Sequence, residues 1–472
     1  MDMTGWREWT RRLTGRVRAG LLALVLVVVL AGTAGAASYM QPYLDKVVEW
    51  GVMRGDIAGN LNENNPITRA EFCTMINRAF GYSRMGSTPF RDVKNNAWYA
   101  QDVAIAYTTG YIKGTSASTF SPESNITREQ AAVILSRILM LPEEVGENTV
   151  FSDSRSMANW SQGYIAAAAH YGLVNGYPNG RFGPQDNLTR GQAAILLVNA
   201  LGTPIREAGT YTLGSVWGSV TITTSGVTLR DTVVGGNLYI TAGVDLGYAT
   251  LENVTVLGDI VISGGGTSEG GEDSVILRNV TAPRMLVDNL GNRFTSVKVE
   301  GDGLINQASV RTNAYLEDNT PDGCGVARID LDGEEELTLT LAGNIKEVVN
   351  SAPRTTLELA SGQAKTITVD EAAVDSTLSI AAGAQVEQVN LDTGIEVTGD
   401  GDIANLTVNA AGSTVSMLPD QIIIRPGITA NIDGEVMDSA AAAESSANPP
   451  LYAGYPQGRD LAPTRPTEAF SA

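Results

Sequence analysis

Two patterns of apolar residues divide the chain. Between Ser38 and Gly202, apolar residues recur at helical spacing in short segments that glycine-containing loops separate. From about Tyr211 onward, Val, Ile and Leu alternate with Thr, Ser and Asn, and the runs break at glycine. The first part holds 18 aromatic residues, whereas residues 203–440 hold only six. We therefore predict a multidomain chain, in which an all-α region precedes an all-β domain at a boundary near Gly202 and Thr203.

The helical region contains three copies of one unit. The sequence I-T-R-A-E at Ile67–Glu71 recurs as I-T-R-E-Q at residues 126–130 and as L-T-R-G-Q at residues 188–192. Upstream of each copy lies a G-x-x-x-G element, and 14 residues separate its second glycine from the arginine in all three copies. A fixed register of this kind indicates a repeated module. The three arginines are Arg69, Arg128 and Arg190.

Each unit reads as two short helices joined by a loop. The second helix is expected to begin after the threonine, because Glu or Gln follows three residues later and the two can form a capping box. The first helix is expected to end just before a glycine that adopts a left-handed cap. These glycines are Gly51, Gly110 and Gly172.

The arginine of each copy lies in the first helical turn, where the helix dipole favours anions over cations. One interpretation is a surface residue that pairs with a nearby carboxylate. Its recurrence favours a second interpretation, an anion site formed by the guanidinium and the free N–H groups of the helix start. An aromatic residue lies 12 positions before the first glycine of each unit, and either a sugar-stacking surface or the core would suit it. These aromatic residues are Tyr39, Trp98 and Trp160.

At these residues the sequence resembles the S-layer homology module, which is usually present as three tandem copies. The shared pattern is F-x-D, W, G-x-x-x-G, T-F-x-P and I-T-R-x-E/Q, and it covers about residues 38–202. The resemblance implies a pseudo-threefold helical assembly. It also implies binding to an acidic, often pyruvylated, cell-wall polysaccharide, or to a peptidoglycan-linked polymer.

In that family the arginine and the early aspartate line grooves between modules. The resemblance therefore implies glycan-binding roles for Arg69, Arg128, Arg190, Asp92 and Asp153, to which we add Trp98 and Trp160 as stacking residues. The first copy departs from the pattern, because its F-x-D position falls before residue 38 and Leu61 replaces the later Phe. We accordingly expect the second and third copies to be the better binding modules.

Polar anchors recur at regular intervals in the β half. Asp231, Asn253 and Asn279 are 22 and 26 residues apart, and each stands within a run of aliphatic residues. Short strands at a period of about 22, with few aromatic residues, suit a β-solenoid whose core consists of stacked aliphatic side chains. A β-sandwich or a barrel is the alternative.

The two ends of the chain carry further signals. An arginine-rich start, an apolar run over Leu21–Leu30 and small residues up to Ala37 predict a signal peptide. An uncleaved membrane anchor is the alternative, but the run is shorter than the roughly 20 residues that span a bilayer. We divide the chain into a signal peptide (1–37), three modules (38–86, 87–147, 148–202), a β-solenoid-like domain (203–439) and a disordered tail (440–472). No contact with a membrane is expected after cleavage.

The composition and the motifs exclude several classes of binding and catalytic site. A formal net charge of −20 disfavours nucleic-acid binding, and a single histidine and two cysteines exclude a multi-histidine metal site or a disulfide framework. The motif G-x-S-x-G around Ser268 lacks a downstream histidine, so we reject a serine-hydrolase elbow. The acidic run at Asp330–Glu336 could bind calcium weakly, although such a run is more often a solvated turn. We expect no catalytic residues, no cofactor and no metal.

The functional hypothesis follows from these points. We expect an exported cell-surface protein, anchored non-covalently to an anionic wall polysaccharide, whose β domain is a structural or display element. Membership of a self-assembling S-layer is one form of this hypothesis. The alternatives are an adhesin and a wall-anchored polysaccharide-degrading enzyme, for which a cleft with paired acids and an aromatic platform would be evidence.

Overall fold

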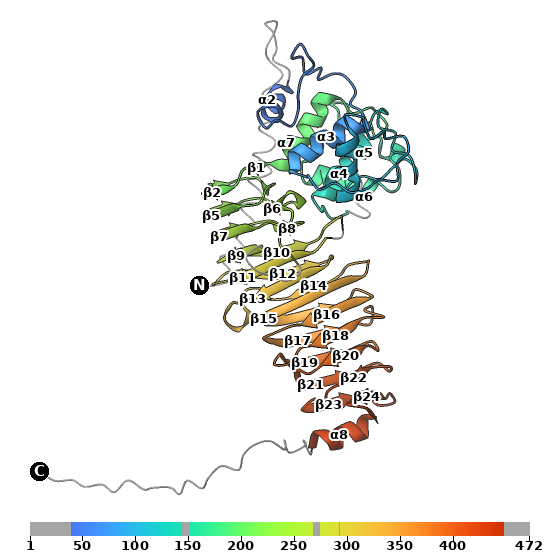
Figure 1. Ribbon diagram of the computed structural model, residues 1–472, viewed down its shortest axis with the longest axis vertical. Coiled ribbons are helices and arrows are strands. Elements are labelled where there is room, and N and C mark those ends of the chain that lie inside the picture. Colours follow the sequence, from blue (N-terminus) through green and yellow to red (C-terminus); the bar gives the residue numbers. More distant parts are fainter. Residues whose placement is uncertain (1–38, 144–150, 268–273, 292, 448–472) are drawn as a thin grey trace, which may run out of the picture.

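A computed structural model describes residues 39–143, 151–267, 274–291 and 293–447. The predicted signal peptide, Ser268 and most of the predicted tail lie outside these ranges. A helical head stands on one end of a long stack of β-strands, and the last helix covers the other end (Figure 1). In the described part of the chain, no helix combines the length and the apolar character that crossing a membrane requires.

Six α-helices form the head within the ranges that the structure describes. They are α2 (Gln41–Glu49), α3 (Arg69–Phe80), α4 (Ala100–Thr109), α5 (Arg128–Ile138), α6 (Gln162–His170) and α7 (Arg190–Leu201), with a short 3-10 turn η1 (Ser154–Ser156). The capping boxes are confirmed: Thr68, Thr127 and Thr189 each accept a hydrogen bond from the N–H group three residues later, and that residue's side chain accepts one in return. Gly51, Gly110 and Gly172 have positive φ values of 66°, 85° and 71°.

A closed ring of backbone hydrogen bonds joins the three modules at their centre. The N–H of Ile67 donates to the carbonyl of Leu188 (2.9 Å), that of Leu188 to Ile126 (2.9 Å), and that of Ile126 to Ile67 (3.1 Å). All three side chains are fully buried. Each module thus donates to one neighbour and accepts from the other, which confirms the predicted pseudo-threefold assembly.

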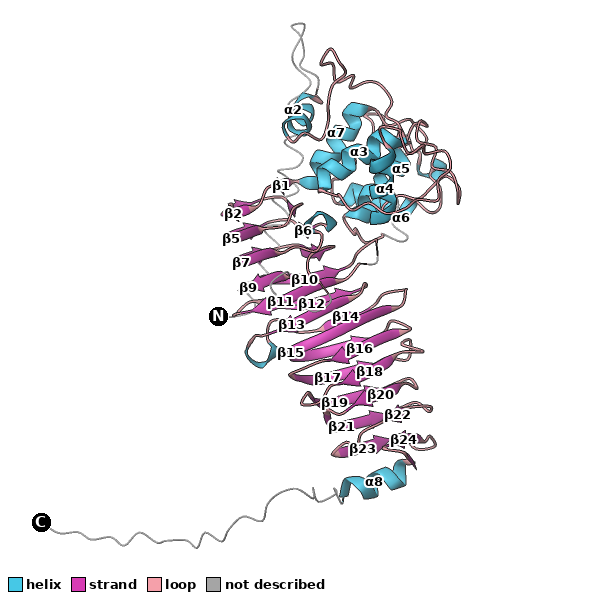
Figure 2. Ribbon diagram, viewed as in Figure 1, coloured by secondary structure: helices cyan, strands magenta, loops and turns pink. Residues whose placement is uncertain are grey.

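The second half is a β-solenoid, as predicted, rather than a sandwich or a barrel. Every strand pairing is parallel except the last, between β24 and β25. Most strands pair with one strand about one coil earlier and one about one coil later in the sequence, so the coils stack along one axis (Figure 2). The upper strands are β1 (Thr203–Ile205), β2 (Gly209–Tyr211), β3 (Gly214–Val216), β4 (Val220–Ile222), β5 (Val227–Val234), β6 (Leu238–Ile240), β7 (Ala249–Val256), β8 (Asp259–Ile262), β9 (Val275–Arg278), β10 (Thr281–Val287), β11 (Thr295–Glu300), β12 (Leu304–Val310) and β13 (Ala314–Asp318), with the short 3-10 turns η2 (Ala242–Val244) and η3 (Pro321–Gly323).

The lower coils continue the same stack. Their strands are β14 (Ile329–Leu331), β15 (Leu337–Asn350), β16 (Thr355–Leu359), β17 (Gln363–Val369), β18 (Thr377–Ile380), β19 (Gln385–Leu391), β20 (Glu396–Gly399), β21 (Asp402–Val408), β22 (Thr414–Val415), β23 (Gln421–Ile424), β24 (Ala430–Ile432) and β25 (Glu435–Met437). Stacked Val, Leu and Ile side chains fill the interior along its length.

The predicted anchors form a ladder at one corner of the solenoid. Asp231, Asn253 and Asn279 all adopt left-handed backbone conformations, with φ values of 48°, 55° and 54°. The amide of Asn253 donates to Asp231 (3.1 Å), and the amide of Asn279 donates to the side-chain oxygen of Asn253 (2.9 Å). Asn and Asp tolerate this conformation better than other non-glycine residues, which explains why they recur once per coil.

The tail differs from the prediction at its start. Residues predicted as disordered from position 440 begin instead with the helix α8 (Ser439–Ala447), which lies against β23 at the end of the solenoid (Figure 1). Ala442 is buried there, and the N–H of Ile422 donates to the hydroxyl of Ser446 (2.8 Å). The segment is rich in alanine, the best helix former, and the last coil offers it an apolar surface to cover.

Candidate functional site

The arginine of each repeat reaches into the loop of the next module. Nε of Arg69 donates to the carbonyl of Phe120 and its Nη2 to the carbonyl of Lys113, both at 3.0 Å. The same pair of bonds recurs for Arg128, to Phe182 and Asn175 (2.8 and 3.0 Å), and for Arg190, to Leu61 and Arg54 (2.8 and 2.9 Å). Because Arg190 of module 3 binds the loop of module 1, the arginine contacts also form a closed ring around the three modules.

Two of these arginines are buried. Arg69 lies over the ring of Phe120, with 4.7 Å between its guanidinium carbon and the ring centroid, and Arg128 lies over Tyr177 and Phe182 at 4.7 and 4.9 Å. Their exposed fractions are 6% and 9%. Burial lowers the pKa of both guanidinium groups below its ordinary value. They nonetheless remain cations at neutral pH, because that ordinary value lies so far above it. These side chains therefore hold the modules together.

The predicted anion site at the helix start is wrong in one respect. It required free N–H groups in the first turn, but the N–H groups of Arg69 and Ala70 donate to the carbonyls of Ser124 (2.9 Å) and Pro122 (3.1 Å) of the next module. Equivalent bonds occupy the first turns of α5 and α7. The loop of the neighbouring module takes the place that an anion would have occupied.

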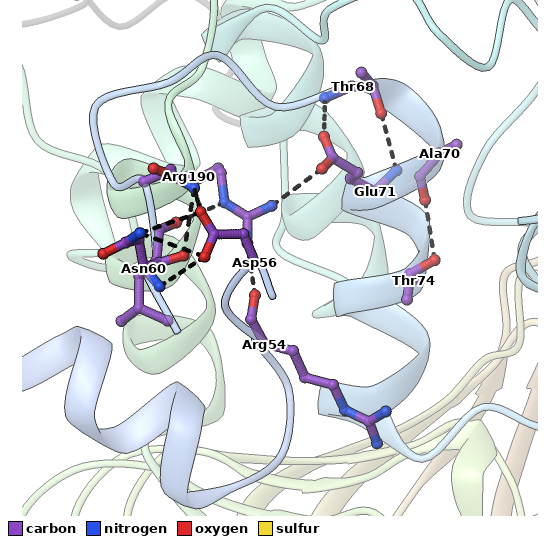
Figure 3. Close-up of polar contacts among 10 residues, drawn as sticks. Arg54, Asp56, Asn60, Thr68, Ala70, Glu71, Thr74 and Arg190 are labelled. Carbon is purple, nitrogen blue, oxygen red and sulfur yellow. Dashed lines mark hydrogen bonds and ion pairs between the residues drawn. The ribbon is translucent and has the colours of Figure 1, made fainter. Parts of the chain in front are cut away.

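The three arginines differ in the hydrogen bonding of their Nη1 atoms. Nη1 of Arg190 lies 3.1 Å from Oε1 of Glu71, the glutamate of the first capping box (Figure 3). The residues equivalent to Glu71 are Gln130 and Gln192, which are neutral. Within the described residues, Nη1 of Arg69 and of Arg128 forms no hydrogen bond. Among the described residues, a carboxylate thus neutralises the repeat arginine at this position only where the third module meets the first, between Arg190 and Glu71.

A groove of about 180 Å³ lies beside Arg190 and draws on all three modules. Glu71, Thr74 and Arg78 of α3 form one wall, and Trp98 from the second module lies at the groove. The indole of Trp98 is 63% exposed, and the equivalent Trp160 and Tyr39 are 56% and 65% exposed. These three aromatic side chains therefore lie on the surface and not in the core.

The aspartates of the F-x-D motifs hold the loops that the arginines contact. The Asp92 carboxylate accepts hydrogen bonds from the N–H groups of Phe120 (2.8 Å) and Ser121 (2.7 Å). Asp153 does the same for Phe182 (2.7 Å) and Gly183 (2.9 Å). Partial burial would raise the pKa of each aspartate, but the backbone donors outweigh it and lower both pKa values below the ordinary range. Both aspartates therefore stabilise the conformation of these loops.

The first module organises its loop with a residue that sequence reasoning missed. Oδ1 of Asp56 accepts hydrogen bonds from the N–H groups of Ala58 (2.9 Å) and Asn60 (3.0 Å), and the amide of Asn62 donates to Oδ2 (3.1 Å; Figure 3 shows part of this cluster). Asn62 has a positive φ of 53°, like the equivalent Ser121 at 58°. The signal was present in the sequence, because an aspartate directly after the second glycine occurs only in the copy whose F-x-D position falls before residue 38.

Two aspartates of the acidic run in the solenoid are bound by arginines. Asp330 accepts a hydrogen bond from Nε of Arg328 (2.7 Å), and Asp332 accepts two from Arg311 (3.1 and 2.8 Å). Among the residues that the structure describes, no group of three or more His, Cys, Asp or Glu side chains could hold a metal ion.

Comparison with known proteins identifies the head. Residues 89–132 and 150–194 match the S-layer homology domain. The N-terminal region contains S-layer homology domains. The surface-layer 125 kDa protein of Lysinibacillus sphaericus is 32% identical over 163 residues, which are 34% of this chain and 14% of that protein.

Other relatives carry the same region beside different functions. An amylopullulanase of Thermoanaerobacterium thermosulfurigenes is 39% identical over 143 residues, 29% of this chain and 8% of the enzyme. A cellulosome-anchoring protein of Acetivibrio thermocellus is 26% identical over 159 residues, 32% of this chain and 35% of that protein. The chain thus spans well under half the length of these relatives, and the matches cover only the S-layer homology region. The shared domain and the surface-layer relatives indicate a cell-surface protein.

Proposed function

We propose that the head anchors this protein to the cell wall by binding an acidic polysaccharide in the grooves between its modules. One observation carries the proposal: an exposed aromatic side chain, Trp98, stands at an inter-module groove that Arg54, Arg78 and Arg190 also line. An indole face stacks on a sugar ring, while a guanidinium hydrogen-bonds the carboxylate of an acidic substituent such as a pyruvyl ketal. The name of the cellulosome-anchoring relative agrees with such a role.

The three junctions between modules differ in charge at the position next to the repeat arginine, and this difference refines the proposal. Glu71 neutralises Arg190 in the first groove, whereas Gln130 and Gln192 leave Arg69 and Arg128 without a neighbouring carboxylate at that position. We infer that the grooves containing Arg69 and Arg128 bind the acidic polymer more tightly. Several weak sites on one head add avidity, because each later contact is intramolecular.

The solenoid then serves as the element that the head displays. It is a rigid stack with a continuous aliphatic core, and α8 covers the strands of its last coil. Covered ends discourage end-to-end pairing of strands between copies, so participation in an S-layer would rely on lateral contacts.

Co-sedimentation of the full chain with purified wall sacculi tests the anchoring. We compare wild type with Trp98→Ala/Trp160→Ala, because these side chains are exposed and their loss leaves the module contacts intact. Trp217→Ala, which removes an 89% exposed indole on the solenoid, is the matched control. The arginines are unsuitable for this test because they hold the modules together.

We expect the wild type and Trp217→Ala to pellet alike. The double variant should bind at least about tenfold more weakly, since loss of each stacking aromatic side chain typically costs about a kcal/mol or more of binding free energy. Sacculi from which hydrofluoric acid has removed the secondary polymer should bind none of the three. Equal pelleting of all three proteins by intact sacculi would contradict the groove assignment, and no pelleting at all would contradict the anchoring.

A further inference from the structure

A second, larger cleft lies between the head and the solenoid. Its volume is about 570 Å³, within the range of small-ligand sites. The head contributes Arg137 from α5, Tyr164 from α6 and Tyr171 just after α6. The solenoid contributes residues from β8, β10 and β12 and from the turn after β14. None of these residues belongs to the inter-module groove described above.

The residues on the floor of the cleft occupy matching positions on neighbouring strands of the solenoid. Asp288, Arg311 and Asp332 each stand directly after a strand, β10, β12 and β14 in turn, and the last residues of these strands are paired neighbours. Neighbouring strands lie about 4.8 Å apart, so the three side chains form a row of alternating charge. A parallel pair, Asp259 and Arg284, lies one strand higher on the same side.

Both solenoid arginines already have carboxylate partners. Nη2 of Arg284 lies 2.5 Å from Oδ2 of Asp259, and Arg311 binds both oxygens of Asp332. Among the described residues, Asp288 and the remaining acids of the lining, apart from Asp259 and Asp332, form no ion pair. These remaining acids are Glu143 and Glu334–Glu336. The remaining basic residue of the lining, Arg137, forms no ion pair either within the described part of the chain. The uncompensated charge in the cleft is therefore negative, five carboxylates against one guanidinium.

Asp288 is the carboxylate with the strongest need for a cation. It is half-buried, and within the described part of the chain it accepts one hydrogen bond, from the N–H of Asn289 (2.7 Å). Burial raises its pKa, although the nearby Arg311 offsets part of the effect. A half-buried carboxylate with so few donors gains most from an ammonium ligand, which brings both charge and N–H groups.

We propose that this cleft binds a cationic amino sugar, as a unit of a glycan strand whose amine is free and protonated. The ammonium would meet Asp288 and the acidic turn after β14. Sugar hydroxyls would hydrogen-bond the paired charges of the floor, and the tyrosines would lie beside the ring. Because Arg311 occupies both oxygens of Asp332, that carboxylate is poorly placed to act as a base, and we assign binding rather than cleavage.

This site is independent of the wall anchor and has the opposite charge preference. An acidic wall polymer suits the grooves of the head and is repelled by this cleft. The two sites can therefore be tested separately, each with its own ligand and its own variants.

Calorimetric titration of the full chain with a glucosamine hexamer tests the proposal. The N-acetylated hexamer, which has the same backbone without the charge, is the paired ligand. The test variant is Asp288→Asn/Glu335→Gln. The control is Asp400→Asn/Asp402→Asn, which removes the same charge from the lower solenoid, far along the stack from the cleft.

We expect the glucosamine hexamer to bind at least about tenfold more tightly than its acetylated form, as the loss of a charge-assisted hydrogen bond implies. The test variant should lose about tenfold in affinity, and the control should bind as wild type does. Equal affinity for the two hexamers would overturn the proposal. Equal weakening by the test and control variants would also overturn it, because it would show attraction to the net charge alone. All variants should pellet with wall sacculi as the wild type does.

Discussion

A single residue type carries two roles in the head. The repeat arginine uses Nε and Nη2 to bind carbonyls of the neighbouring module, and in Arg190 the remaining Nη1 contacts Glu71, whose equivalents in the other copies are glutamines. Where that residue is Glu71, the guanidinium is neutralised. Under the proposed anchoring, one side chain would therefore change the binding strength of a groove while the module contacts stay constant.

Glu71→Gln tests this division of roles. Gln occupies the same capping position in the other two copies, so the helix start should be preserved. Removing the carboxylate should strengthen binding of the full chain to sacculi by about two- to fivefold, the size of a partly exposed ion pair. Glu371→Gln, an equal change of charge at an exposed solenoid site, is the control. Weaker binding by Glu71→Gln than by the control would contradict the role of the carboxylate.

Asp92 gives a prediction about pH. Its folded pKa lies below the ordinary value of 3.8, so the carboxylate stabilises the fold above about pH 4, and the contribution is lost as the pH falls through the folded pKa. Asp92→Asn should lower the free energy of unfolding near pH 7 by about 1–2 kcal/mol, because one loop N–H loses its acceptor. Urea unfolding near pH 7 and near pH 2 checks this. A difference between wild type and variant that is equally large at both pH values would contradict it.

At the level of secondary-structure elements, features that depend on nearby residues could be predicted from the sequence, whereas the tertiary contacts of those elements could not. The capping boxes and the anchors of the asparagine ladder depend on residues close in sequence or on a constant period, and both were predicted correctly. The carbonyls that bind Arg69 lie 44 and 51 residues away and are main-chain groups without a side-chain signature. The repeat revealed that the arginine mattered, but only the fold revealed that the neighbouring loop fills the helix start. The helix α8 escaped prediction because its stability comes from the last coil that it covers.

The ladder itself makes a prediction. Asn253 combines a left-handed backbone with two side-chain hydrogen bonds, so Asn253→Ala should lower the free energy of unfolding by about 2–3 kcal/mol. Asn253→Gly relieves the backbone cost and should lose only about 1 kcal/mol. Denaturant unfolding of both variants separates the two terms. A glycine variant as stable as the wild type would show that the ladder contributes nothing.

On the scale of the whole molecule, the head and the solenoid share a packed junction. Tyr239 and Val261 of the solenoid belong to the head's apolar core. The hydroxyl of Thr241 donates to the carbonyl of Phe80 (3.0 Å), and that of Thr221 to the carbonyl of Leu201 (2.8 Å). The orientation of the solenoid relative to the head is therefore set by these contacts, which suits the proposed display element.

Gly243 tests this coupling. A Cβ atom there would lie 2.3 Å from the carbonyl oxygen of Phe80 in the head and 2.5 Å from that of Thr223 in the solenoid, so Gly243→Ala must disturb the junction between them. Calorimetry should show the head unfolding together with the upper coils in the wild type. In the variant the head should unfold at a lower temperature, for a cost of about 1–3 kcal/mol. Gly218→Ala, with no atom within 4 Å of the added carbon, is the control. Separate head and solenoid transitions in the wild type would contradict the coupling.

The anchoring proposal depends on which aromatic side chains the wall polymer covers. The most direct measurement is hydroxyl-radical footprinting of the full chain with and without polysaccharide released from the wall. Trp98, Trp160 and Trp217 are all more than half exposed, so each should be oxidised readily in the free protein. We expect the polysaccharide to protect Trp98 and Trp160 and to leave Trp217 unchanged. Unchanged oxidation of Trp98 and Trp160, or protection of Trp217 alone, would contradict it.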